Sequence, residues 1–286
     1  MQIQFFLTIL AVGKKVNYLK VMEIPQLISI NRIKRRYHTG EEPVWVECND
    51  LNSYICKYMR SSSAAYKLTC ELIGDLLIHL WGIYTPQIAF VKIKSQDWPH
   101  FTSINFSAPS LGSRFIPESI DITPVSYSEI KRSGALTCQL MMIGLFDLWV
   151  GNEDRNYNNA NLLYDLVKNE LIAIDHGCIF NTASFDYKMS LLTFNESILQ
   201  SDLASYLFAG LSGDKIQMLI KKMKVNYEKC IDLCRARSQT IISIIPREWN
   251  VPISNIHHKL DELFDPEWIE RCWLTFVELM EDREYV

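Results

Sequence analysis

The sequence lacks a strong excess of either charge. Its 286 residues carry 29 lysines and arginines against 33 aspartates and glutamates, a net charge of −4. Proteins that hold nucleic acid by its phosphates usually present a basic surface, so direct nucleic-acid binding is not expected. One short run, residues 31–38, is basic, and a run of this length usually forms a solvated face. A hydrophobic share of 48% is typical of a globular protein with a large core.

Paired cysteines are lacking as well. The eight cysteines include no CxxC pair, and most lie within apolar stretches, as reduced core thiols do. Cys230 and Cys234 would share one face of a helix, but no further Cys or His pair completes a zinc site. Because reduced cysteines are typical of intracellular proteins, the sequence predicts a cytoplasmic location.

The N-terminal region lacks the signals of a secretory leader. Its apolar stretch, residues 5–13, follows no basic segment, precedes no small-residue cleavage site and is too short to span a bilayer. Stable membrane insertion is therefore not expected. Residues 1–21 are interpreted either as a targeting or interfacial segment or as an extension upstream of an alternative start at Met22.

No internal repeat or low-complexity tract divides the chain, so its organisation is inferred from local patterns. Alternating β-forming residues at 44–48 and 53–59 flank an NDLN turn and predict a hairpin. Leucines at helical spacing after a run of capping serines predict a helix over residues 61–82. Residues 86–93 then read as another strand. Residues 95–127, rich in Pro, Ser and Asn, are interpreted as a linker or hinge.

The later part of the chain reads as helical. A helix over roughly residues 128–150 is apolar almost all round, which predicts that it is buried. Helical patterns dominate from about residue 196, and the last helix is expected to begin at an Asp265 cap with Pro266 in its first turn.

This order of strands followed by helices predicts an α+β fold with two lobes. We expect a small β-rich N-lobe over residues 22–110 and a larger, mostly helical C-lobe over residues 111–286. The C-lobe would contain the catalytic loop.

Polar side chains concentrate in residues 147–177. Asp154 opens a loop after the expected buried helix, where a carboxylate can accept a proton from a hydroxyl group. Asn159 lies just before the strand-like segment NLLY, which Asn161 begins, and Asp175 ends the strand-like segment ELIAID. Amide and carboxylate oxygens at strand ends suit Mg²⁺. The alternative is an Asn- and Asp-rich hairpin loop held by its own turns.

A lysine and a glutamate in the first half of the chain add to this group. Lys57 lies within an expected strand and shares a face with apolar residues. It is either an edge lysine that reaches solvent or a lysine that grips phosphate oxygens in a cleft. Glu71, on the following helix, can pair with it. His176 is interpreted as structural, because Mg²⁺ does not seek imidazole.

Strand lysine, helix glutamate, buried helix, Asp–Asn loop, strand pair and final aspartate follow the order found in protein-kinase-like folds. The segments FDLWVGNEDRNYNNANLLYD and ELIAIDHGCIF resemble the HipA-like kinases, especially the bacterial HipA-like kinase-domain group. A more distant similarity links them to the phosphatidylinositol 3-/4-kinases. SYICKYM and LGSRFI are similar to the N-lobe and lobe connection of the HipA-like family, and the resemblance covers about residues 38–182. It implies a two-lobed protein-kinase-like fold.

The resemblance also implies ATP and Mg²⁺ as cofactors and assigns roles by position. Lys57 would contact the phosphates of the nucleotide, with Glu71 as its helix partner. Asp154 would be the catalytic base, and Arg155 would order the catalytic loop beside it. Asp175 would bind the metal.

The sequence departs from the family pattern in three places. Asn156 stands where histidine is commoner. The metal-binding asparagine of the family lies five residues after the base and directly before a strand; Asn159 fits the count, Asn161 fits the strand context, and both remain candidates. No glycine-rich GxGxxG loop is present, which leaves Gly40 as the candidate lid over the phosphates.

The resulting expectation is an ATP- and Mg²⁺-dependent phosphotransferase that acts on a Ser/Thr hydroxyl of a protein. Two alternatives stay open. A nucleotide-binding pseudokinase or regulatory protein would keep the fold without transfer. A lipid or small-molecule kinase would need a basic or membrane-facing acceptor side, which the acidic net charge does not favour.

Overall fold

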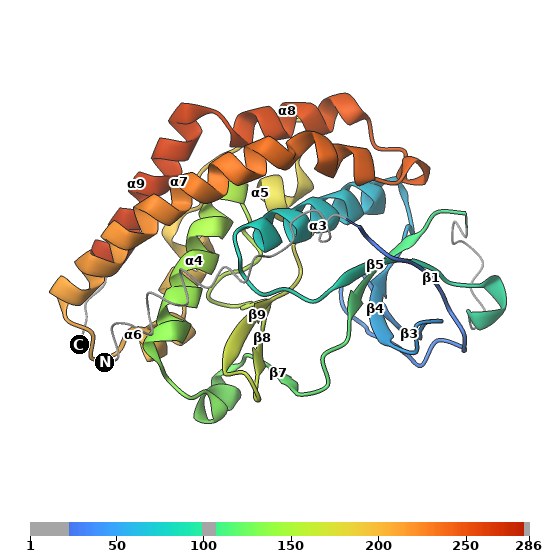
Figure 1. The fold of residues 1–286 in the computed structure, drawn as a ribbon, viewed down its shortest axis with the longest axis horizontal. Coiled ribbons are helices and arrows are strands. Elements are labelled where there is room, and N and C mark those ends of the chain that lie inside the picture. The colour runs from blue at the N-terminus through green and yellow to red at the C-terminus, as the bar shows by residue number, and fades with distance from the viewer. Residues whose placement is uncertain (1–22, 99–106, 283–286) are drawn as a thin grey trace.

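A six-stranded sheet forms the N-terminal part of the protein, and helices form most of the C-terminal part (Figure 1). The computed structural model describes residues 23–98 and 107–282, so the segment expected as an extension, residues 1–21, lies outside the described residues. The α+β, two-part organisation expected from the sequence is confirmed. In spatial order, the strands of the sheet are β1 Gln26–Ile28, β5 Ile88–Lys92, β6 Ser110–Arg114, β4 Ser53–Lys57, β3 Val44–Glu47 and β2 Arg35–Arg36.

The expected hairpin is the antiparallel pair β3 and β4, in which Val44 lies opposite Cys56. Side chains on successive residues of a strand point to opposite faces. Tyr54 and Cys56 are accordingly buried in a small core on one face of the sheet, which also contains Val44. Lys57 lies one residue further along β4, and its side chain is therefore directed to the other face.

The segment expected as a linker instead contributes a central strand. β6 lies between β5 and β4, with Leu111 opposite Lys57. A Cβ at Gly112 would lie 2.9 Å from a methyl group of Val91, so glycine allows the close approach of these strands. The linker interpretation is thus wrong for the described part of the segment; residues 99–106 lie outside it. The expected N-lobe limit at residue 110 falls on the first residue of β6. Because β6 belongs to the six-stranded sheet, the N-terminal part of the protein extends through Arg114.

Helix α3 Ser62–Leu80 confirms the expected helix. The Ser61 hydroxyl accepts a hydrogen bond from the backbone N–H of Ala64 and caps its start. Its apolar side chains belong to the large core shared with the C-terminal helices, not to the small core of the sheet. A Cβ at Gly74 would lie 2.4 Å from the Cβ of His176. Helix α3 therefore packs very closely against the segment that follows strand β9 (Glu170–Ala173).

A second sheet has three antiparallel strands: β7 Ser119–Asp121, β8 Leu162–Asp165 and β9 Glu170–Ala173. β8 and β9 are the two strands expected around the polar stretch. Leu162 lies opposite Ala173, and just beyond this pair the N–H of Ile174 donates to the carbonyl of Asn161 at 3.1 Å. The residue before β8 and the residues after β9 therefore lie side by side.

Helix α4 Gly134–Val150 is buried almost all round, as expected, although it begins later than residue 128 because residues 124–129 form a 3₁₀ turn. Asp265 caps the last helix as expected and accepts from the N–H groups of Glu267 and Trp268. Helix α7 packs on α3 and spans much of the helical part (Figure 1). The remaining helices are α5 Ile179–Ala183, α6 Asp202–Phe208, α7 Gly213–Ile244, α8 Ile253–Leu263 and α9 Pro266–Glu281, with 3₁₀ turns η1 Ser95–Asp97, η2 Pro124–Glu129, η3 Phe194–Glu196, η4 Ile198–Gln200 and η5 Arg247–Trp249.

All eight cysteines are free thiols. Within the described ranges, no helix combines the length and the apolar character needed to cross a bilayer.

Candidate functional site

Lys57 lies at the centre of a cluster of carboxylates. Its ammonium Nζ is 2.8 Å from Oε2 of Glu71, 2.7 Å from Oδ1 of Asp175 and 3.2 Å from Oε2 of Glu41. The partners come from α3, from the end of β9 and from the loop between β2 and β3. The structure thus brings Lys57, Glu71 and Asp175 together, although Asp175 is 118 positions away from Lys57 in sequence.

Carboxyl groups outnumber the cation in this cluster, because Glu41, Glu71 and Asp175 all face the single ammonium of Lys57. Burial lowers the pKa of Lys57, but the charges of Glu71, Asp175 and Glu41 outweigh it and hold the pKa well above the usual value. Burial raises the pKa of Asp175, but Lys57 outweighs this and holds it below its usual value. Burial raises the pKa of Glu71 to about 8 against the opposing effect of Lys57.

Asp154 lies in the loop after α4, close to both candidate asparagines. The amide nitrogen of Asn161 donates to Oδ2 of Asp154 at 2.9 Å, and that of Asn159 donates to the same oxygen at 3.3 Å. Asn161 is half-buried at the start of β8, whereas Asn159 is exposed. Asn161 is therefore the better ordered of the two and lies beside the end of β9.

Two residues of this region adopt backbone conformations that are rare for side chains other than Asn, Asp and Gly. Asn161 has φ of 44° and Asp175 has φ of 59°. Asn and Asp tolerate the left-handed region better than other residues with a Cβ, and such strain often marks functional sites. The pKa of the Cys178 thiol is raised, chiefly by burial. The negative charge of Asp154 raises it further, and that of Asp175 contributes less, so the carboxylates of Asp154 and Asp175 both lie near Cys178.

Arg155 is fully buried and connects the elements that carry these side chains. Its guanidinium donates to the carbonyls of Asn161 at 3.3 Å and of Ile174 at 2.8 Å, and it pairs with the buried carboxylate of Asp147 on α4. Burial raises the pKa of Asp147 to about 7. Arg155 therefore links the loop to the residue before β8 and to the segment after β9.

His176 is fully buried against α3. Its Nδ1 lies 3.4 Å from Oδ1 of Asp75, and burial lowers its pKa, so the imidazole is neutral at neutral pH. Glu71, Asp75 and His176 lie close enough to be considered as metal ligands, but Glu71 is engaged by Lys57 and Asp75 by the hydroxyl of Thr85. The structural interpretation of His176 stays a prediction.

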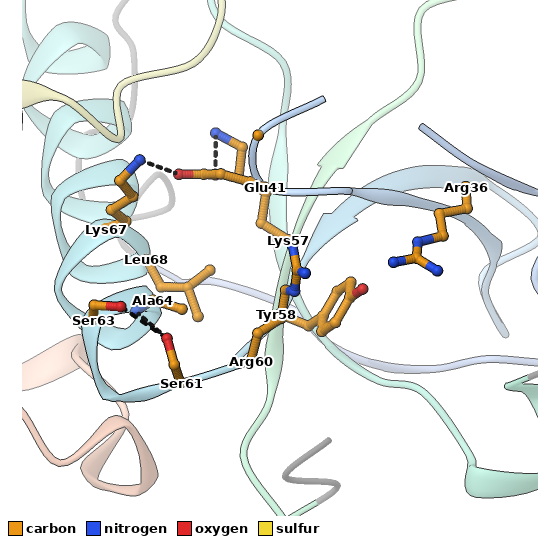
Figure 2. Close-up of a pocket in the computed structure, with 11 residues that line it drawn as sticks. Arg36, Glu41, Lys57, Tyr58, Arg60, Ser61, Ser63, Ala64, Lys67 and Leu68 are labelled. Carbon is orange, nitrogen blue, oxygen red and sulfur yellow. Dashed lines mark hydrogen bonds and ion pairs between the residues drawn. The ribbon is translucent and has the colours of Figure 1, made fainter. Parts of the chain in front are cut away.

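A pocket of about 500 Å³ opens beside Lys57, between the β2–β3 loop and the start of α3 (Figure 2). Gly40 lies in this loop and lines the pocket, and a Cβ at its position would contact nothing within 4 Å. Glu41 follows it and is reached by both Lys57 and Lys67 (Figure 2). The loop therefore occupies the position expected of a lid, although its contacts are made by glutamate side chains and not by glycine backbone.

The donor set around Lys57 fits a hard divalent cation. Mg²⁺ prefers carboxylate and amide oxygens and keeps water and phosphate oxygens in its shell. Asp175 is 38% exposed and can offer a carboxylate oxygen. The amide of Asn161 points its nitrogen at Asp154, which leaves its oxygen as the remaining donor atom.

Glu41 and Asp147 were not among the residues selected from the sequence. Glu41 follows a glycine in a turn, a context typical of a solvated surface residue, and nothing local indicates its contact with Lys57. Asp147 offered a clearer signal, because it is an ionisable residue within a helix that is otherwise apolar almost all round. Such a residue usually has a buried partner.

The family model described as HipA-like kinase matches residues 30–272. Among solved structures, the chain is similar to the crystal structure of a Helicobacter pylori proinflammatory kinase, CtkA, with 14% sequence identity and a TM-score of 0.49; the match covers 89% of this chain and 99% of that one. No curated protein matches the sequence at a significant level. Because the family model spans well over half of its length, the chain belongs to the HipA-like kinase family of phosphotransferases.

Proposed function

We propose that the protein is an ATP- and Mg²⁺-dependent kinase that transfers a phosphoryl group to a serine or threonine hydroxyl of a protein. The observation that carries this proposal is the ion pair network of Lys57 with Glu71 and Asp175. It joins a strand, a helix and the end of β9 at one point. A lysine fixed in this way, beside an aspartate able to bind a metal, suits the phosphates of a nucleotide.

Each residue then has a separate task. Lys57 contacts phosphate oxygens, and Glu71 holds its ammonium in place. Asp175 and Asn161 would hold Mg²⁺, which would supply positive charge beside the phosphates. Asp154 orients the acceptor hydroxyl and accepts its proton while the bond from the terminal phosphorus to the leaving oxygen of ADP breaks. Arg155 touches no reacting atom and acts by positioning the loop.

The site contains no side chain that must form a covalent intermediate in this scheme. The contribution of the protein is orientation of the two substrates and stabilisation of negative charge on the transferred group. The buried pair of Arg155 and Asp147 supports this interpretation, because it fixes the loop that carries Asp154 against both strands of the metal site.

The test is a transfer assay with γ-labelled ATP, purified protein and casein as a general acceptor, with and without EDTA. We expect label in protein only when Mg²⁺ is present, and we expect acid hydrolysis to release phosphoserine or phosphothreonine. ATP binding with no transfer to any acceptor would favour the pseudokinase alternative. Transfer to phosphatidylinositol vesicles but not to protein would replace the acceptor class proposed here.

A further inference from the structure

The loop between β2 and β3 carries two adjacent glutamates, and each of them pairs with two cations. Glu41 lies 3.2 Å from Nζ of Lys57 through Oε2 and 3.4 Å from Nζ of Lys67 through Oε1. Glu42 pairs with Arg36 and lies 2.8 Å from the guanidinium of Arg60. Two loop carboxylates thus engage four cations.

These four cations line the same pocket. Arg36, Lys57, Arg60 and Lys67 surround it together with the hydroxyls and backbone at the start of α3 (Figure 2). Several convergent cations at the first turn of a helix suit a phosphorylated ligand, because phosphate accepts many charge-assisted hydrogen bonds. The carboxylates of Glu41 and Glu42 lie against these cations where the oxygens of such an anion would bind.

Glu41 also crowds the carboxylates of the proposed metal site. A Cβ at Gly177 would lie 3.3 Å from Oε2 of Glu71, 3.5 Å from Oε1 of Glu41 and 3.6 Å from Oδ1 of Asp175. Three carboxylates therefore converge on the space beside this glycine. The phosphates of a nucleotide, which are themselves negative, cannot approach Lys57 favourably while Glu41 remains there.

We propose that the loop of residues 37–43 is an acidic plug, in which Glu41 and Glu42 hold the cations that the phosphates of the nucleotide need. This inference rests on the proposed function, because it assigns those cations to nucleotide phosphates. Nucleotide and plug compete for the cations, so the apparent affinity for ATP is lower than that of the open pocket.

The backbone conformation of residues 37–43 agrees with a loop that is held closed by the ion pairs of Glu41 and Glu42. Glu42 has φ of 47°, a left-handed conformation that is unfavourable for glutamate. Its N–H donates to the carbonyl of Thr39 at 3.0 Å, and the ends of the loop are joined from Tyr37 N–H to the carbonyl of Pro43 at 2.9 Å. Once the phosphates take over the cations, the contacts that hold Glu42 in this conformation are lost, and the loop can leave the pocket.

Calorimetric titration tests the plug directly. The ligands are ATP, inorganic tripolyphosphate and adenosine, each in EDTA, so that the metal site does not contribute. The proteins are the wild type, Glu41→Gln, Glu42→Gln and the double variant. Glu118→Gln is the matched control, because it removes the same charge at an exposed position outside the pocket.

We expect Glu41→Gln to bind ATP and tripolyphosphate about three- to tenfold more tightly than the wild type, and the double variant to bind them more tightly still. Adenosine, which carries no phosphate, should bind all five proteins within about twofold. Glu118→Gln should match the wild type, which would show that net charge alone does not explain the gain.

Equal or weaker binding of ATP and tripolyphosphate by Glu41→Gln and by the double variant would overturn the plug, because the carboxylates would then not oppose phosphate. If the wild type nevertheless transfers phosphate to protein, the proposed function survives this failure. Tighter tripolyphosphate binding by the variants without any transfer would instead support the plug and reject the catalytic proposal.

Discussion

Two ion-pair clusters in the described part of the chain, that of Arg155 and that of Lys57, differ in how far they are exposed to solvent. Arg155 and Asp147 are both fully buried, and the guanidinium also donates to two backbone carbonyls. Lys57 is 15% exposed and is surrounded by three carboxylates, one of which, that of Asp175, is 38% exposed. The first cluster is closed to solvent, whereas the second lies at an opening and has more carboxyl groups than cations.

The difference separates a structural role from a binding role. A fully buried ion pair is closed to a ligand, and removing one member leaves an unpaired buried charge. Carboxylates at an opening favour binding of a cation or of a ligand that brings one. Perturbed carboxylates occur in both clusters, so a shifted pKa alone would not distinguish them.

The largest expected effects concern activity in the open cluster and its neighbour. Asp175→Asn and Asp154→Asn should each lower the rate of transfer by about 10³-fold, because each removes a charge that acts directly on the reacting groups. Thermal unfolding should shift little, since both side chains are at least partly exposed at the site. A transfer assay beside a melting curve measures both, and a variant that unfolds would show that its aspartate is structural.

Asp147→Asn is the matched change in the closed cluster. It leaves the guanidinium of Arg155 buried without a counter-charge, which should cost about 3–5 kcal/mol of unfolding free energy. Urea titration measures this loss. Activity per folded molecule should fall much less than in Asp175→Asn. Unchanged stability would contradict the structural role assigned to the pair.

A smaller effect should distinguish the two asparagines. Asn161→Ala removes a half-buried amide beside the end of β9, and we expect about tenfold weaker apparent Mg²⁺ affinity in the transfer assay. Asn159→Ala removes an exposed amide with a longer contact to Asp154, and we expect less than about threefold. The reverse order would assign the metal to Asn159.

The smallest effect is a dependence of stability on pH. The pKa of Glu71 is raised from 4.5 to about 8, so the folded protein keeps a proton that the unfolded chain releases. This contribution is complete below pH 4.5 and is lost as the pH rises through 8, by about 1 kcal/mol between pH 7 and 9. Glu71→Gln should flatten this part of the profile in urea titrations. An equal slope in both proteins would exclude Glu71 as its source.

The sequence predicted those elements whose signals are local. The hairpin of β3 and β4, helix α3 and the strands β8 and β9 each carry their own periodicity, cap or turn. β6 was missed because its sequence is rich in turn-forming residues. Its strand conformation depends on pairing with β4 and β5, which are distant in sequence.

The candidate site divides in the same way. Lys57, Asp154 and Asp175 lie in recognisable local patterns, and their pattern also carries the family resemblance. Glu41 could not be found in this way, because its importance comes from a contact across the pocket that no spacing rule indicates. Asp147 carried a local signal as an ionisable residue in an apolar helix, but its pairing with Arg155 is seen only in the folded chain, where it joins α4 to the loop of Asp154.

The close contact at Gly74 has a consequence for how this family varies. Any side chain larger than hydrogen at this position would overlap His176, so the two positions form one steric unit. A relative with alanine at the position of Gly74 must either shift the helix that carries Glu71 or carry glycine, which has no Cβ, at the position of His176. Substitutions at these two positions should therefore covary, and a chimera that exchanges only one of them would misplace the glutamate that holds Lys57.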